Sequence, residues 1–210
     1  MDQADRVGVN HGNTVASVQS DGNMVALIQN MDEYKTYTHT PPHLFRAGAK
    51  YFITASTYEK KRILDDAAKE KLLYSLFKSC LNHGWKLEDW VILDNHYHIM
   101  ANAPEQALNL SKFVAEYHKF TALFIIKHNH ASVTLPKVFN NYWDTCITYA
   151  NSYYARLNYL YNNPVKHGYV QNAQDYKWGS YYIRYYRDKE YVEKLLNDFP
   201  CDTVKVVDDY

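Results

Sequence analysis

Residues 90–100 of the chain read WVILDNHYHIM, and this stretch decides the fold. Two apolar runs, rich in β-branched and aromatic residues, flank Asp94-Asn95, a pair suited to a tight turn, so we predict two strands joined there. Alternate side chains of a strand share a face, which puts His96 and His98 on one face about 6.6 Å apart. Two imidazoles at that spacing can bind one metal ion, whereas an isolated pair is more often a solvated strand face. Tyr97 points to the opposite face.

The segments around this stretch predict the remaining elements. Strand-forming runs and helical periodicities alternate along the chain. Strands are expected at 50–57, 86–93, 96–101 and 138–148, and helices at 65–82, 105–128 and 151–163. This order predicts an α+β fold of the ferredoxin-like type, with helices covering one face of a mainly antiparallel sheet.

The two ends of the chain differ from this central domain, which we place at 44–185. Residues 1–30 are rich in polar residues and glycine, and residues 1–43 are expected to form a flexible N-terminal extension. Residues 33–49, which contain Pro41-Pro42, are expected to be an irregular lead-in to the first strand of the domain. Residues 186–210 are expected to form a C-terminal tail, with a short helix at 188–196.

Composition limits the function classes. The 210 residues carry 23 Lys and Arg against 23 Asp and Glu, and this zero net charge argues against a large non-specific nucleic-acid interface. Three scattered cysteines indicate a reducing compartment, and no apolar run is long enough to cross a membrane. We therefore expect a cytoplasmic protein with no membrane association.

The third predicted helix carries the residues that could complete a site. Arg156, Tyr159 and Asn163 are spaced i, i+3 and i+7 and share one helix face. If that face covers the histidine strand, two imidazoles and one amide oxygen form an incomplete shell that suits Mg²⁺ or Mn²⁺. Zinc would more typically recruit a cysteine or carboxylate. Pro164 predicts that the helix ends near Asn163.

A phenol beside such an ion has a defined chemistry. Its pKa of about 10 makes it a poor nucleophile at neutral pH, and a nearby cation such as Arg156 would favour the phenolate. A divalent ion on a phosphodiester oxygen orients the phosphorus for in-line attack, which would give a covalent phosphotyrosine. Tyr161 is the rival nucleophile, but it lies roughly 200° around the helix from Tyr159.

Two motifs resemble one family. Residues 95–98 (NHYH) resemble the HUH motif, and residues 159–170 (YLYNNPVKHGYV) resemble the closing motif of the REP-associated single-tyrosine transposases, IS200-like members of the HUH superfamily. The resemblance implies a metal-dependent, single-stranded DNA endonuclease and strand transferase acting near hairpins formed by palindromic repeats. It also implies that His96 and His98 are metal ligands, Asn163 the third ligand and Tyr159 the nucleophile.

Other features leave alternatives open. Basic residues could hold DNA phosphates or simply form solvated faces; they are Lys60, Lys61, Arg62, Lys112 and Lys119. His167 is expected to cap the third helix. The family includes monomers and its neighbours include dimers, so both remain possible. The alternative functions are a catalytically quiet hairpin-binding or regulatory protein, and an unrelated domain with an incidental pair of histidines.

Overall fold

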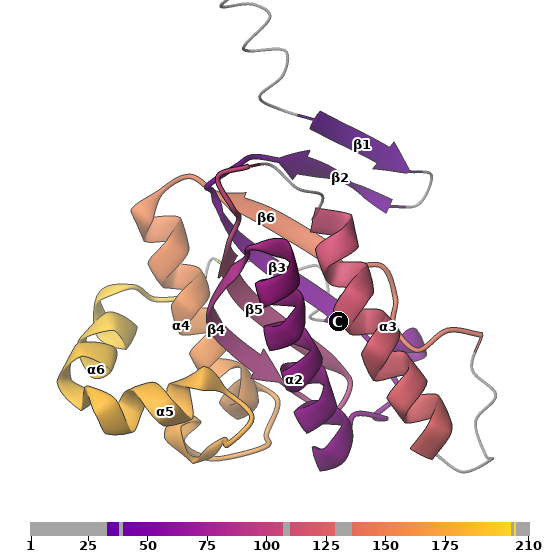
Figure 1. Cartoon of the computed structure of the whole chain (residues 1–210). Helices are drawn as coiled ribbons and strands as arrows, with labels where there is room; N and C mark the ends of the chain where they lie inside the picture. The colour runs from indigo at the N-terminus through magenta and orange to yellow at the C-terminus, as the bar shows by residue number, and fades with distance from the viewer. Residues whose placement is uncertain (1–32, 38–39, 107–109, 129–135, 203, 205–210) are drawn as a thin grey trace, which may run out of the picture.

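The computed structural model describes residues 33–37, 40–106, 110–128, 136–202 and 204. Its centre is a four-stranded antiparallel sheet with the spatial order β4-β5-β3-β6. The strands are β3 (Lys50–Ser56), β4 (Lys86–Ile92), β5 (His96–Asn102) and β6 (Trp143–Ile147). With a helix after β3 and another after β5, this is the ferredoxin-like arrangement, and the predicted α+β class is confirmed (Figure 1).

The histidine strand β5 lies inside the sheet, between β3 and β4. In its register with β3, His98 pairs with Thr54 and His96 with Ser56. The Asp94-Asn95 turn is closed by the Leu93 amide, which donates to the His96 carbonyl over 2.8 Å. Both neighbours therefore fix the position of β5.

One face of the sheet is covered by α2 (Asp66–His83) and α3 (Leu110–His128), which pack side by side in Figure 1. Asp65 caps α2 by accepting from the Ala68 amide over 2.8 Å, and Gly84 ends it in a left-handed conformation (φ 70°). The buried core between these helices and the sheet includes Tyr51, Ile53, Leu72, Tyr97, Ile99 and Phe113.

The opposite face is covered by α4 (Ala150–Lys166), so the expectation that helices cover a single face is wrong. Each of β3, β4 and β5 also has a buried apolar side chain on this side, and these side chains need a second cover. This second core includes Phe52, Val91, Met100, Leu157 and Leu160, with Val192 and Leu195 from the C-terminal helix.

The C-terminal segment is more structured than expected. The helix predicted at 188–196 is confirmed as α6 (Lys189–Asp198), with Asp188 accepting from the Tyr191 amide over 3.2 Å as its cap. A further helix, α5 (Ser180–Arg187), was not predicted. Its apolar positions are mostly tyrosines, which carry a weak periodic signal because tyrosine suits both surface and core.

Two other expectations are corrected. The irregular lead-in instead contains a hairpin of β1 (Glu33–Tyr37) and β2 (Thr40–Phe45). Successive backbone nitrogens of a strand point to opposite edges, so only one of the two prolines faces the free edge; the other lies opposite the register irregularity between Lys35 and Tyr37. The segment 138–148 forms a strand only from Trp143, and Phe139 makes an isolated bridge to Thr57. Most of the predicted N-terminal extension, residues 1–32, lies outside the described residues.

The third predicted helix also runs past its expected end. Helix α4 includes Pro164 and ends at Lys166. A proline in the last turn removes only one helical hydrogen bond, and the buried Pro164 side chain adds to the second core. In the described part of the chain, no helix is both long and apolar enough to cross a membrane.

Candidate active site

The structure brings the two histidines of β5 against α4. His96 and His98 lie on the α4 side of the sheet, with their ring centroids 5.1 Å apart, and both are buried. Helix α4 places Tyr159 and Asn163, which are also buried, above them. Four of the five side chains predicted to converge from a strand and a later helix therefore meet here.

The Nδ1 atoms of both histidines face hydrogen-bonding groups of their own strand layer. His96 Nδ1 lies 2.8 Å from Asn95 Oδ1, and His98 Nδ1 lies 2.7 Å from Thr54 Oγ1. Such contacts hold a ring in place and leave the other nitrogen available. Asn95 was predicted from the sequence only as a turn residue and as part of the NHYH motif, and Thr54 only as part of a strand.

The other ring nitrogens of the two histidines and the amide of Asn163 have few or no hydrogen-bond partners among the described residues. His96 Nε2 lies 3.2 Å from Asn163 Oδ1. Within the described structure, His98 Nε2 and Asn163 Nδ2 are buried without a hydrogen-bond partner. An orphaned buried polar atom is costly, and a bound cation would satisfy the imidazole nitrogen.

The donor set fits a divalent cation. No group of three His, Cys, Asp or Glu side chains among the described residues could hold a metal ion, so the third donor would be the amide oxygen of Asn163. Burial, together with positive charge from His96, His167 and Lys166, lowers the pKa of His98 well below its usual value. The ring therefore stays neutral, as a metal ligand must be.

Tyr159 lies directly on the histidine pair. Its ring centroid is 5.3 Å from that of His98 and 6.2 Å from that of Phe52, both in edge-on geometry. Lys166 Nζ lies 4.9 Å from the centroid of the Tyr159 ring. Lys166 was not predicted as a neighbour of the phenol, although it lies seven residues after Tyr159 on the same helix.

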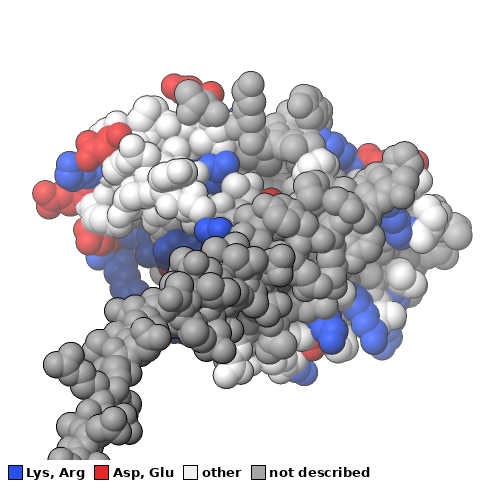
Figure 2. Space-filling view, turned by 90° about the horizontal axis from the view of Figure 1, so that it is seen from above, with Lys and Arg blue, Asp and Glu red and all other residues white. Residues whose placement is uncertain are grey.

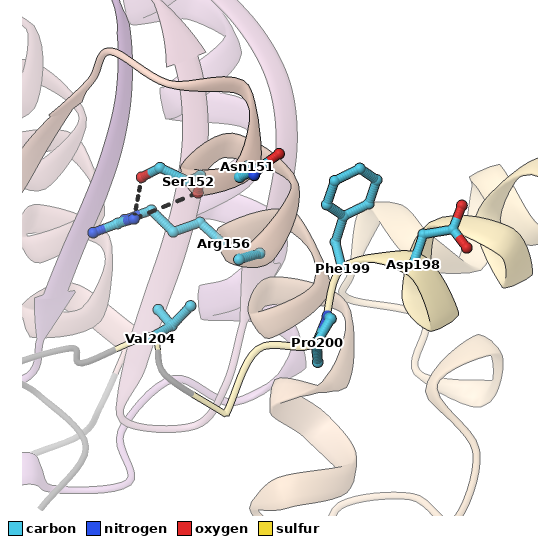
Figure 3. A pocket seen from close by; sticks show the side chains of 8 residues that line it. Asn151, Ser152, Arg156, Asp198, Phe199, Pro200 and Val204 are labelled. Carbon is cyan, nitrogen blue, oxygen red and sulfur yellow. Dashed lines mark hydrogen bonds between the residues drawn. The ribbon is translucent and has the colours of Figure 1, made fainter.

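Arg156 lies elsewhere. Its guanidinium donates to Ser152 Oγ over 2.5 Å and to the Ser152 carbonyl over 3.4 Å, within its own helix. It lines a cavity of about 600 Å³ between the first turns of α4, residues 198–200 and Val204 (Figure 3). The cation beside the phenol ring is thus Lys166, and the role predicted for Arg156 receives no support from this placement.

Tyr161 points away from the histidines. Its hydroxyl donates to Asp89 Oδ1 over 2.9 Å, and burial raises the pKa of its phenol. The fully buried Asp89 also accepts from Ser180 Oγ over 2.8 Å and from Arg184 over 2.6 and 2.7 Å. Tyr161 therefore has a structural partner away from the histidines, which agrees with its predicted place on another face of the helix.

The predicted basic residues fall into two groups, one at an end of the sheet and one on a helix that covers the face away from α4. Lys60, Lys61 and Arg62 follow β3, at the end of the sheet where His96 lies. The exposed Lys112 and Lys119 belong to α3, on the opposite face. Figure 2, which views the molecule from above Figure 1, shows lysine and arginine side chains of the described residues at several separate places, with Asp and Glu side chains among them.

His167 follows α4 directly. It is the C-terminal cap residue, as predicted, and its amide donates to the Asn163 carbonyl over 3.1 Å. Its exposed ring also lies 4.9 Å, centroid to centroid, from that of His96. The cap thus borders the site, which sequence spacing alone did not indicate.

Comparison with known proteins gives consistent matches. Residues 46–172 match the family model described as "Transposase IS200 like". A REP-associated tyrosine transposase of Escherichia coli (strain K12) is 24% identical over 153 residues, which is 72% of this chain and 84% of that protein. A solved REP-associated tyrosine transposase, bound to a REP hairpin, shares the fold with a TM-score of 0.58 and 22% identity, over 86% of this chain and 95% of that one.

Proposed function

The chain belongs to the IS200-like transposase family, and from this premise we propose that it is a metal-dependent single-stranded DNA endonuclease and strand transferase. The observation that carries the proposal is the meeting of His96, His98 and Asn163 with Tyr159 between β5 and α4. A potential metal-binding set beside a phenol suits phosphoryl transfer to a tyrosine, because the ion would activate the phosphodiester that the phenol attacks.

Three side chains would hold Mg²⁺ or Mn²⁺: His96 and His98 through Nε2, and Asn163 through Oδ1. When bound, the ion would withdraw charge from the phosphorus and orient the phosphodiester for in-line attack. The protein's own contribution is to hold the rings through Thr54 and Asn95.

Tyr159 performs the covalent step. The phenol first loses its proton to solvent, and the phenolate oxygen attacks the phosphorus. The bond from phosphorus to the 3′-oxygen breaks, and the leaving 3′-oxygen takes a proton from solvent to become the 3′-hydroxyl. The product is a 5′-phosphotyrosine, and attack by another 3′-hydroxyl reverses the step and joins strands. The ammonium of Lys166, close to the ring, stabilises the phenolate that precedes attack.

The substrate is proposed to be single-stranded DNA next to a hairpin of palindromic repeats. The support is the solved relative, which is bound to a REP hairpin. Lys60, Lys61 and Arg62, at the His96 end of the sheet, would neutralise phosphates. Because Tyr159 and His98 are only 4% and 0% exposed, the substrate reaches them after the surrounding chain moves aside.

A denaturing gel tests the proposal. The protein is incubated with Mn²⁺ or Mg²⁺ and hairpin DNA labelled at its 3′ end, because the 3′ fragment carries the 5′-phosphotyrosine. We expect labelled DNA to migrate with the wild type and with Tyr161→Phe, but not with Tyr159→Phe or without metal. An adduct on Tyr159→Phe would refute the assigned nucleophile.

A second function is supported by the zero net charge: hairpin binding without cleavage. It predicts metal-independent binding of the same hairpins and no adduct across a panel of hairpins from the source genome. Binding without any adduct would favour this function over strand transfer.

A further inference from the structure

The side chain of Asn95 connects a backbone turn to the first histidine. Its Nδ2 donates to the Lys60 carbonyl over 3.2 Å, and its Oδ1 lies 2.8 Å from His96 Nδ1. Asn95 therefore contacts both the segment that follows β3 and a proposed metal ligand. Because the two contacts use the two ends of one amide, they constrain each other.

The Lys60 carbonyl decides which way the amide faces. A carbonyl oxygen only accepts hydrogen bonds, so the NH₂ group of Asn95 must be the end that contacts it. The amide oxygen then necessarily faces His96. Since this oxygen also only accepts, the Nδ1 atom of His96 must carry a hydrogen.

This arrangement fixes the tautomer of His96. A neutral imidazole has one N–H group, so a hydrogen on Nδ1 leaves a bare Nε2 with its lone pair toward Asn163. The competing partner is Asn163 Oδ1, 3.2 Å from Nε2, which would favour the other tautomer. Among the described residues, however, the Asn163 NH₂ group has no partner that fixes its direction. The Asn95 side, with the shorter contact, therefore sets the tautomer.

The turn that presents the Lys60 carbonyl is itself held firmly. Glu59 and Lys60 both have φ of 53°, a conformation that non-glycine residues adopt only when the surroundings impose it. Thr57 imposes it from the end of β3: its hydroxyl donates to the Lys61 carbonyl over 2.6 Å, and its amide donates to the Asn95 carbonyl over 2.8 Å.

We propose that Asn95 is a positioning residue that holds His96 in the Nδ1–H tautomer, with its own amide oriented by the carbonyl of Lys60. Asn95 touches no substrate and acts through His96, whose bare Nε2 is then ready to bind the divalent ion. The tautomer itself needs no metal, and only its benefit for ion binding rests on the proposed function.

The first test measures the tautomer directly. Imidazole ¹⁵N chemical shifts of the metal-free protein distinguish a bare Nε2 from a protonated one, with His96 assigned through His96→Gln. We expect the wild type to have a bare Nε2, and Asn95→Ala to shift His96 toward the Nε2–H form, in which it donates to Asn163. Asn95→Asp should keep the wild-type tautomer, because a carboxylate oxygen still accepts from Nδ1–H.

The second test measures Mn²⁺ affinity by calorimetry on the full chain. Loss of a residue that orients a metal ligand typically weakens metal binding by about 10- to 100-fold, which we expect for Asn95→Ala. Asn95→Asp should stay within a few-fold of the wild type. The control is Asn102→Ala at the other end of β5, where Asn102 contacts Lys50 and Glu88 and the affinity should not change.

Three results would overturn the proposal: a protonated Nε2 in the wild type, a tautomer unchanged in a folded Asn95→Ala, or equal losses of affinity in Asn95→Ala and Asn102→Ala. The wild-type spectrum decides even if Asn95→Ala does not fold. A wild type that forms no DNA adduct would contradict the proposed function and leave the tautomer assignment standing, so the two failures are distinguishable.

Discussion

His96 Nε2 on β5 and Asn163 Oδ1 on α4 lie 3.2 Å apart, across the boundary between the sheet and its second helical layer. Both atoms are potential donors to one ion, yet they come from elements 67 residues apart in the chain. An ion bound by both would connect α4 to the sheet. Binding at this site is therefore coupled to the stability of the whole second layer.

Metal addition should stabilise the protein. An ion at 100 times its dissociation constant adds about 2.7 kcal/mol to the free energy of unfolding. For a protein of this size that is a rise of roughly 5–10 °C in Tm. Thermal melts with Mn²⁺ and with EDTA measure the rise. His98→Gln should abolish it, and an equal rise in that variant would place the ion elsewhere.

Lys166→Met should slow formation of the DNA adduct at pH 7 by roughly tenfold, because a cation within about 4–6 Å favours the ionised form of an acidic group. The reason is loss of the ammonium 4.9 Å from the Tyr159 ring. The deficit should shrink as pH rises and the phenol ionises without help. Single-turnover rates across pH measure this, with Lys112→Met as the control. A deficit independent of pH would contradict the assigned role.

Tyr161→Phe should leave the adduct intact but destabilise the fold. The hydroxyl of Tyr161 is one of several donors to the fully buried Asp89, and its loss leaves that carboxylate less satisfied. We expect a cost of about 1–3 kcal/mol in the free energy of unfolding, measured by urea titration. Exposed Tyr186→Phe is the control and should cost nothing measurable.

Acid should destabilise the protein through His118. Burial lowers the pKa of this ring to about 3, and its Nε2 lies 2.7 Å from the Tyr97 hydroxyl. In the unfolded chain the His118 ring has a pKa near 6.5 and therefore binds a proton at a higher pH than in the folded protein. The stability that depends on the neutral ring is fully present above about pH 6.5 and is lost progressively as the pH drops toward 3. The ring is partly exposed, which makes about 2 kcal/mol an upper bound for the loss between pH 7 and 5.

His118→Gln tests this pH dependence, because an amide oxygen still accepts from Tyr97 but does not titrate in this range. Urea titrations at pH 7 and pH 5 should show a smaller difference for the variant than for the wild type. An equal difference in both proteins would assign the acid sensitivity to other groups.

The basic residues near the site should matter more for DNA than those on α3. Arg62 lies over the Tyr169 ring at 5.7 Å, at the His96 end of the sheet, whereas Lys112 lies on the opposite layer. Arg62→Ala should weaken hairpin binding and lower the slope of log affinity against log salt by about 1. Lys112→Ala should change neither. A reversed outcome would move the DNA to the α2–α3 face.

The central fold was predictable because its signals are local. Strand-forming runs fixed β3, β4 and β5, and the aspartate cap and glycine end fixed α2. The position of the second helical layer was harder to predict, because the sequence of a helix does not show which face of the sheet it will cover. The β1–β2 hairpin was missed because two prolines normally argue against a strand.

The site was predictable where spacing carries chemistry. The two histidines and the i, i+4 pair of Tyr159 and Asn163 follow from strand and helix periods. Arg156 was predicted as the cation beside the phenol, and Lys166 is found there instead. The sequence could not show this, because a long side chain can reach several different neighbours. The proposed role of Asn95 in orienting His96 could not be predicted, because it depends on a hydrogen bond to the Lys60 carbonyl, 35 residues away in the chain.

Successive side chains of strand β5 face the two different helical layers. His96 and His98 face α4, while Tyr97 between them faces α3, where its hydroxyl lies 2.8 Å from that of Tyr117. Inserting one residue between His96 and Tyr97 would put Tyr97 on the face of His96 and His98 on the opposite face, which places a phenol in the site and an imidazole in the apolar core. Evolution can therefore vary the side chains on this strand, but not its residue count.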